Sequence, residues 1–166
     1  MRRRTLIPVL LLLSGCGEPA RQSKLLTPSV KSVLGSPDSV RVFRLHPDPV
    51  GKGAKESVTW ADARTTAEVV PDAATMKELS ALLSDPRTYD FEGGKGCIPH
   101  PGVKVCFMRG AATVDACLCF ECLMMCFYGS GASGDDAWVD FDPGAPALTR
   151  LVKKLFPNDP AIQSLK

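Results

Sequence analysis

The stretch VKVCFMRGAATVDACLCF, residues 103–120, decides the fold of this chain. Its apolar residues alternate with other residues on both sides of Arg109–Gly110, which predicts two half-buried strands joined by a turn. For the apolar side chains of both strands to share one face, the loop between them needs an even number of residues. A two-residue loop at Arg109–Gly110 meets this condition and sets Lys104 opposite Asp115, an attractive charge pair. A four-residue loop over 109–112 meets it as well.

Two further segments have the apolar period of amphipathic helices. The first runs from Asp72, which can cap its N-terminus, to Leu83, and Pro86 prevents it from continuing. The second carries an apolar stripe between Pro146, which can start a helix, and Pro157, which stops it. Both helices therefore have one face to bury against another element.

Short strands are expected around the central hairpin. The other segments rich in β-forming residues are 40–45, 57–60, 67–70 and 138–141. Strands flanked by two amphipathic helices predict an α+β fold, in which a small antiparallel sheet has two helices packed on it. A chain of 166 residues has room for one such domain, over 39–166, and not for two.

The N-terminus has the composition of an export signal. Arginines at 2–4 precede an apolar run that ends at Leu13, and Gly15 and Cys16 follow. A basic start, a short apolar stretch and small residues at the cleavage point are typical of a secretory signal. The apolar run from Leu6 to Leu13 is too short to cross a bilayer, which needs roughly 20 residues.

The four residues Leu13-Ser14-Gly15-Cys16 resemble the lipobox of bacterial lipoproteins. The resemblance implies that a signal peptide, residues 1–15, is removed and that Cys16 becomes the lipidated N-terminus. Two or three acyl chains hold a protein stably on a membrane, so the membrane is the first expected partner. Gly17 stands where the lipoprotein sorting rule has aspartate for the inner membrane. In an organism with two membranes, this implies the outer membrane, facing the periplasm.

The mature chain is expected to have no strong net charge. The full sequence has 20 basic and 18 acidic residues, and loss of the three signal arginines leaves 17 basic against 18 acidic. Such a balance provides no basic surface for nucleic acid, which is therefore not an expected partner. Residues 16–38 carry the lipid and are rich in Pro, Ser, Lys and Gln, so they are expected to form a flexible tether.

Six cysteines beyond Cys16 are the main candidate functional residues: Cys97, Cys106, Cys117, Cys119, Cys122 and Cys126. An exported chain with an even number of cysteines is expected to form disulfide bonds. In the two-residue register Cys106 lies about four residues from the level of Cys117, too far for a bond. The same register, extended, brings Cys97 level with Cys122. We therefore expect Cys97 to bond to Cys119 or Cys122.

A metal or redox site is the alternative interpretation of these cysteines. Positions i and i+3 of a strand point to opposite sides, so in a strand Cys119 and Cys122 could not bind one ion. If residues 118–127 formed a helix instead, Cys119, Cys122 and Cys126 would share one face beside two methionines. Such soft donors suit copper, with zinc as the other option. More loosely, residues 97–122, with their Cys-Phe-x-Cys motif, resemble uncharacterised bacterial envelope lipoproteins, a resemblance that implies no activity.

The sequence contains no recognisable catalytic motif. His46 and His100 lie beside prolines in expected loops, and neither belongs to a nucleophile motif. The aspartates over 135–142 lack the spacing of a calcium loop and are expected to form a solvated acidic loop. We therefore expect a non-catalytic domain without a cofactor, which binds an unknown envelope protein or ligand or has a structural role. The alternative is a thiol-dependent redox or soft-metal module.

Overall fold

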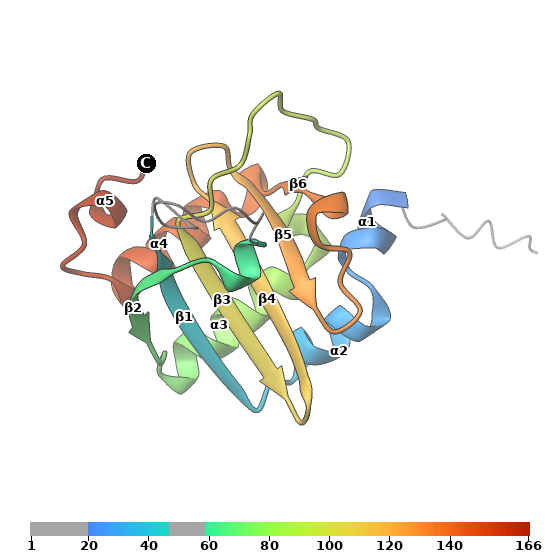
Figure 1. Cartoon of the computed structure of the whole chain (residues 1–166), viewed down its shortest axis with the longest axis horizontal. Coiled ribbons are helices and arrows are strands. Elements are labelled where there is room, and N and C mark those ends of the chain that lie inside the picture. The colour runs from blue at the N-terminus through green and yellow to red at the C-terminus, as the bar shows by residue number, and fades with distance from the viewer. Residues whose placement is uncertain (1–19, 47–58) are drawn as a thin grey trace, which may run out of the picture.

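The computed structural model describes residues 20–46 and 59–166, which form a six-stranded antiparallel sheet with helices packed on it (Figure 1). The strand order across the sheet is β2-β1-β3-β4-β5-β6. The strand bounds are β1 Ser39–Leu45, β2 Thr65–Val69, β3 Val103–Arg109, β4 Ala112–Cys119, β5 Met124–Gly129 and β6 Val139–Asp140. This architecture confirms the α+β class expected from the sequence.

The longer helices lie on one side of the sheet. In Figure 1, α2, α3 and α4 lie behind the sheet, while the short 3-10 turn η1 lies in front of it. The α-helices are α1 Ala20–Leu25, α2 Pro28–Gly35, α3 Ala73–Ser84, α4 Ala145–Leu155 and α5 Pro160–Gln163. The 3-10 turns are η1 Trp60–Asp62, η2 Pro86–Thr88, η3 Gly134–Ala137 and η4 Asp142–Gly144. Among the described residues, no helix has the length and apolar content that crossing a membrane requires.

The main core lies between the sheet and these helices. Alternate residues of the central strands face it, with Val105 opposite Ala116 and Phe107 opposite Val114, all at most 1% exposed. Leu79 of α3 is fully buried in the same cluster. Because side chains alternate along a strand, the intervening positions form the second face of the sheet, which carries the cysteines of β3, β4 and β5.

The central hairpin differs from the first expected register by two residues and pairs Met108 with Thr113, as the alternative loop over 109–112 implies. Its loop has two residues, as the parity argument requires, but they are Gly110 and Ala111 rather than the pair one position earlier. Gly110 takes a φ of +55°, a conformation open to glycine at the first position of a tight hairpin turn. Lys104 therefore lies opposite Cys117. Its ion pair with Asp115, 3.8 Å from Nζ to Oδ2, is diagonal across the strands.

The prediction of a flexible tether over 16–38 is wrong for the described part of that segment. Residues from 20 onward form α1 and α2, and three apolar residues of α2 are at most 3% exposed: Val30, Val33 and Leu34. The hydroxyl oxygen of Thr27 caps α2 by accepting a hydrogen bond from the Val30 amide at 3.2 Å. Three buried residues at positions i, i+3 and i+4 are enough to fold a short helix onto the sheet, although the surrounding composition is polar.

Most other elements agree with the sequence predictions. Asp72 caps α3, with its Oδ1 accepting from the Thr75 amide at 2.7 Å, and α4 ends before Pro157. The strands expected at 40–45, 67–70 and 138–141 correspond to β1, β2 and β6. β5 and α5 have no counterpart among the predicted elements.

Some predictions concern segments outside the described residues. These are the signal peptide over 1–15, the lipidated Cys16 and the first half of the strand expected over 57–60. Trp60, the last residue of that expected strand, begins η1, so the strand prediction is wrong at its described end.

Candidate functional site

Cys97 and Cys122 form a disulfide bond, with Cα atoms 6.2 Å apart. Cys97 is exposed in the loop that leads into β3, while Cys122 is only 7% exposed in the turn between β4 and β5. The bond therefore joins two segments at the same end of the sheet. It confirms the expectation that Cys97 bonds to Cys119 or Cys122.

The free thiol of Cys119 lies beside this disulfide. Cys119 ends β4 and is fully buried, and its Sγ accepts a hydrogen bond from the backbone N–H of His100 at 3.3 Å. Cys119, Cys122 and Met124 form one apolar cluster, against which Trp138 packs. A disulfide and a buried thiol thus share the same small cluster of side chains.

A second pair of sulfurs lies on the same face of the sheet. Cys117 of β4 and Cys126 of β5 are directly opposite each other in the ladder, and both are fully buried. Tyr128 belongs to their cluster, and Trp60 and Trp138 pack against it. Burial raises the pKa of both thiols well above its usual value, so both are protonated at neutral pH.

Cys106 is the remaining free cysteine of the described part of the chain. It lies half-buried on β3, opposite Asp115. Burial, assisted by the neighbouring Asp115 carboxylate, raises the pKa of the Cys106 thiol to about 12. Because the thiolate is the reactive form, Cys106, Cys117 and Cys126 are all poor nucleophiles near neutral pH.

The helix on which the metal interpretation depended does not form. Residues 118–127 make up the end of β4, a turn and the first part of β5. Cys119, Cys122 and Cys126 therefore share no helix face: Cys122 is in the disulfide, and Cys126 lies opposite Cys117. Within 20–46 and 59–166, no three His, Cys, Asp or Glu side chains are grouped so as to hold a metal ion.

A cleft of about 320 Å³ opens at the disulfide end of the sheet. Its walls come from the end of β1, η1, the loop before β3, the β4–β5 turn and the C-terminal segment around α5. Trp60, His100 and Phe120 provide aromatic lining. The imidazole of His100 meets the indole of Trp60 edge-on, with ring centroids 6.0 Å apart. His100 thus connects the cleft with the buried Cys119 sulfur.

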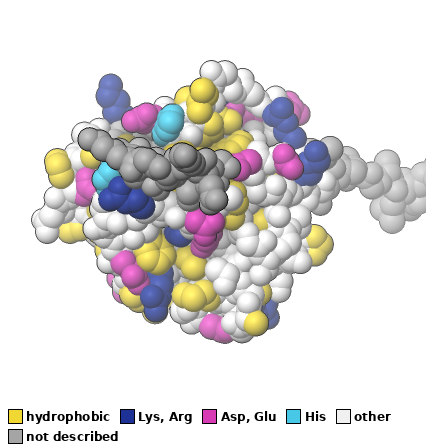
Figure 2. All heavy atoms as spheres, viewed as in Figure 1, with side chains coloured by type: hydrophobic (Ala, Val, Ile, Leu, Met, Phe, Trp, Pro, Cys, Tyr) yellow, Lys and Arg dark blue, Asp and Glu magenta, His cyan; other side chains and the backbone are white. Residues whose placement is uncertain are grey.

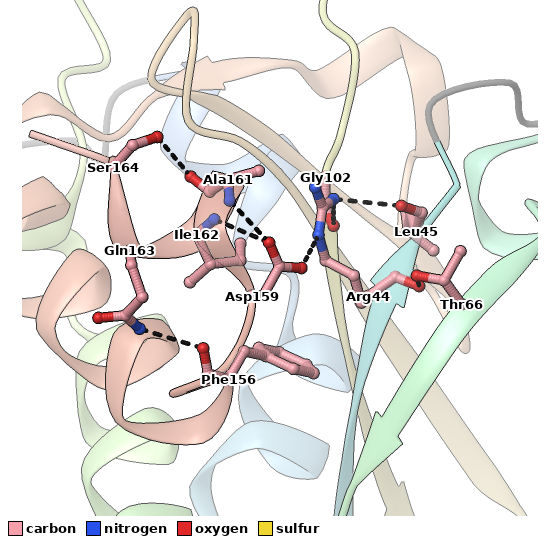
Figure 3. A network of polar contacts seen from close by, with 10 residues as sticks. All are labelled: Arg44, Leu45, Thr66, Gly102, Phe156, Asp159, Ala161, Ile162, Gln163 and Ser164. Atoms are coloured by element: carbon pink, nitrogen blue, oxygen red, sulfur yellow. Dashed lines mark hydrogen bonds and ion pairs between the residues drawn. The ribbon is translucent and has the colours of Figure 1, made fainter.

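Arg44 ties three walls of this cleft together (Figure 3). Its Nε donates to Asp159 Oδ2 at 2.8 Å, and its Nη1 donates to the carbonyl oxygens of Leu45 at 3.1 Å and Gly102 at 2.7 Å. The guanidinium therefore links β1 to the loop before β3 and to the segment that starts α5.

Asp159 completes the network as the N-cap of α5. Its Oδ1 accepts hydrogen bonds from the backbone N–H groups of Ala161 at 2.9 Å and Ile162 at 3.1 Å. Burial alone would raise the pKa of Asp159, but hydrogen bonds from Ile162 and from Arg44 outweigh it and hold the pKa below its usual value. Asp159 is therefore charged at neutral pH and balances Arg44. A second cavity, of about 500 Å³, is also lined by this ion pair.

The described surface on one side of the molecule has no dominant charge. Figure 2 shows basic and acidic side chains scattered over the face toward the viewer, without a continuous area of one sign. The prediction of a solvated acidic loop is wrong for Asp140, which is only 5% exposed. Burial raises the pKa of its carboxyl group. Lys95 Nζ lies 3.9 Å from Asp140 Oδ1 and also pairs with Asp142. Lys95 thus offsets part of the negative charge of Asp140 and Asp142.

Both histidines lie outside helices and strands, as predicted. His46 follows β1, where its backbone N–H donates to the Arg64 carbonyl at 2.8 Å, and His100 is exposed in the loop before β3. Neither the cleft nor the role of Arg44 was predicted from the sequence. The lining residues come from five separate segments, so no local pattern could bring them together.

Comparison with known proteins provides no functional assignment. A scan against protein-family models finds no match, and searches of curated proteins and of solved structures find none either. The function must therefore be inferred from the residues of this chain and their geometry.

Proposed function

We propose that this chain is a lipid-anchored protein of the bacterial envelope whose α+β domain binds a small molecule in the cleft beside Arg44. The cleft itself is the observation that carries the proposal. Its volume of about 320 Å³ is within the range of small-molecule sites, roughly 300–1,000 Å³. Its lining combines aromatic and aliphatic side chains with a few polar groups, as such sites usually do.

The ties around the cleft favour a preformed binding site. The loop before β3 is held at Cys97 by the disulfide and at Gly102 by the hydrogen bond from Arg44. The C-terminal segment is held by the ion pair between Arg44 and Asp159. Walls that are fixed before binding lose little conformational entropy when a ligand enters, which increases affinity.

The disulfide also supports export, because such bonds persist in oxidising compartments. The anchor is inferred from the lipobox that ends at Cys16. Only three residues separate Cys16 from Ala20, where α1 begins. Even an extended chain of that length spans about 14 Å, so the acyl chains would hold the domain close to the membrane surface.

Metabolic labelling with an alkyne fatty acid tests the anchor. We expect the wild-type chain to be labelled and recovered with membranes. The Cys16→Ser variant should be unlabelled and should retain its signal peptide. A wild-type chain that carries no label would refute the anchor.

A matched pair of variants tests the cleft. The purified lipidated protein, in detergent, is screened by thermal shift against a panel of small aromatic acids, amines and neutral ring compounds. Ala161 lines the cleft, so Ala161→Trp should abolish the stabilisation by any compound that binds there. Ala81→Trp, at an exposed position of α3, should preserve it. A panel without a stabilising compound, or equal stabilisation of both variants, would contradict the proposal.

A further inference from the structure

Three cysteine sulfurs surround one short stretch of the loop before β3. The Ile98 carbonyl oxygen lies 3.8 Å from the Sγ atoms of both Cys97 and Cys122, which form the disulfide. Two residues further on, the His100 amide contacts the Sγ of Cys119 at 3.3 Å. The thiol and the disulfide therefore contact backbone groups that lie two residues apart in the same loop.

We propose that Cys97, Cys119 and Cys122 form a thiol–disulfide exchange site whose external substrate is a low-molecular-weight disulfide. In the internal step, the Cys119 thiol loses its proton and its sulfur attacks Cys122 Sγ. The bond between Cys122 and Cys97 breaks, and its electron pair leaves on the Cys97 sulfur, which takes up a proton. One disulfide replaces another, so this step consumes no oxidant or reductant.

The external step uses the Cys97 thiol that the internal step releases. The Cys97 thiolate attacks a disulfide R–S–S–R, forms the mixed disulfide Cys97–S–S–R and releases R–S⁻, which takes up the proton that Cys97 lost. The external disulfide supplies the oxidising equivalent. The reverse sequence, begun by an external thiol, restores the bond between Cys97 and Cys122.

The exposure of the three sulfurs fits these roles. Cys97 is exposed and Ile98 beside it is 79% exposed, so a substrate can reach this sulfur and contact an apolar side chain next to it. Cys119 and Cys122 are buried, so external compounds cannot reach them directly. The backbone N–H of His100 points at Cys119 Sγ, and such a donor stabilises a sulfur that carries negative charge.

The local backbone allows the internal step without unfolding. Cys119 and Cys122 are three positions apart, on either side of the first part of the β4–β5 turn, and they belong to the same apolar cluster. Cys97 lies in a loop without regular structure. The exchange therefore requires side-chain rotation and a shift of one turn and one loop, while the ladder of the sheet stays paired.

Oxidised glutathione is the probe for the external step. The mature protein, in detergent at pH 8, is incubated with it, quenched with acid and digested for disulfide mapping by mass spectrometry. We expect glutathione on Cys97, together with a peptide in which Cys119 is bonded to Cys122. Cys119→Ser should lower the modification of Cys97 by roughly tenfold or more, because no internal thiol then releases it. Cys106→Ser, on the same face of the sheet, should leave the modification unchanged.

A second variant tests the internal pair if Cys119→Ser does not fold. In Cys97→Ser, Cys119 and Cys122 should form a disulfide in a buffer of reduced and oxidised glutathione, and the thermal unfolding transition should remain cooperative. A Cys97→Ser protein that folds and keeps Cys119 and Cys122 as thiols would overturn the proposal. So would equal modification of Cys97 in the wild type and in a folded Cys119→Ser variant. Neither measurement depends on the ligand of the cleft or on the lipid anchor.

Discussion

Leu34→Ala tests whether the N-terminal segment is part of the folded domain. Leu34 lies in α2 and is fully buried in the main core. The substitution removes three carbon atoms, which at about 0.8 kcal/mol per buried methylene is about 2.4 kcal/mol of lost transfer free energy. The cavity left behind adds to this, so we expect the free energy of unfolding to fall by about 3 kcal/mol. For a domain of this size, that corresponds to a melting temperature lower by roughly 6–12 °C.

Urea unfolding of the mature protein, followed by circular dichroism, measures this change. Ser29→Ala is the matched control, because Ser29 is exposed on the same helix. Surface substitutions of that kind usually change the free energy of unfolding by less than about 0.5 kcal/mol. If Leu34→Ala changed stability as little as Ser29→Ala, α2 would not be packed on the sheet and the segment would be a tether after all.

Three further predictions follow from the charges and thiols of the site. Among the described residues, unfolding in guanidinium should expose four free thiols: Cys106, Cys117, Cys119 and Cys126. Of these, Cys106, Cys117 and Cys126 should react only slowly in the native protein, because burial keeps them protonated. Arg44→Ala should lower the free energy of unfolding at pH 7 by about 1–2 kcal/mol, because Asp159 loses its partner. The pKa of Asp159 in the folded protein is below its usual value, so the destabilisation by Arg44→Ala should have its full size above about pH 4 and become smaller at lower pH. Urea titrations at pH 3 and pH 7 would measure this difference. Lys95→Gln removes the cation beside Asp140, and burial raises the pKa of that carboxyl group. The substitution should therefore lower the free energy of unfolding more at pH 7 than at pH 4. An equal decrease at both pH values would contradict this.

Local sequence signals were sufficient for the elements that carry their own boundaries. α3 has a capping aspartate and a terminating proline, α4 lies between two prolines, and β1 is a short run of β-forming residues. The parity of the central hairpin was also predictable, because a shift by one residue would turn every apolar side chain to the wrong face. Parity does not distinguish registers that differ by two. The conformation of Gly110 does, because glycine adopts a positive φ at the first turn position without a steric cost.

The composition of the N-terminal segment indicates a linker, although its residues have the spacing of a helix. The segment is rich in Ser, Lys and Pro, which is typical of a linker. Thr27 followed by Pro28, however, is typical of the start of a helix. Val30, Val33 and Leu34 have the spacing of a buried helix face. Whether such a short stripe is buried depends on a matching surface elsewhere, which only the folded sheet provides.

The disulfide shows why a correct pairing can come from an inexact register. In the observed register of β3 and β4, an extended ladder would place residue 97 opposite residue 124, yet Cys97 bonds to Cys122. The bond forms because the chain before β3 leaves the ladder, where Pro99 and Pro101 cannot donate backbone hydrogen bonds. That same departure from the sheet places His100 against both Trp60 and the Cys119 sulfur. The irregular loop, tied at one end by a covalent bond and at the other by Arg44, is therefore what joins the cleft to the sulfur cluster. A ladder between β3 and β4 that continued through residues 97–102 would have produced neither the bond between Cys97 and Cys122 nor these contacts of His100.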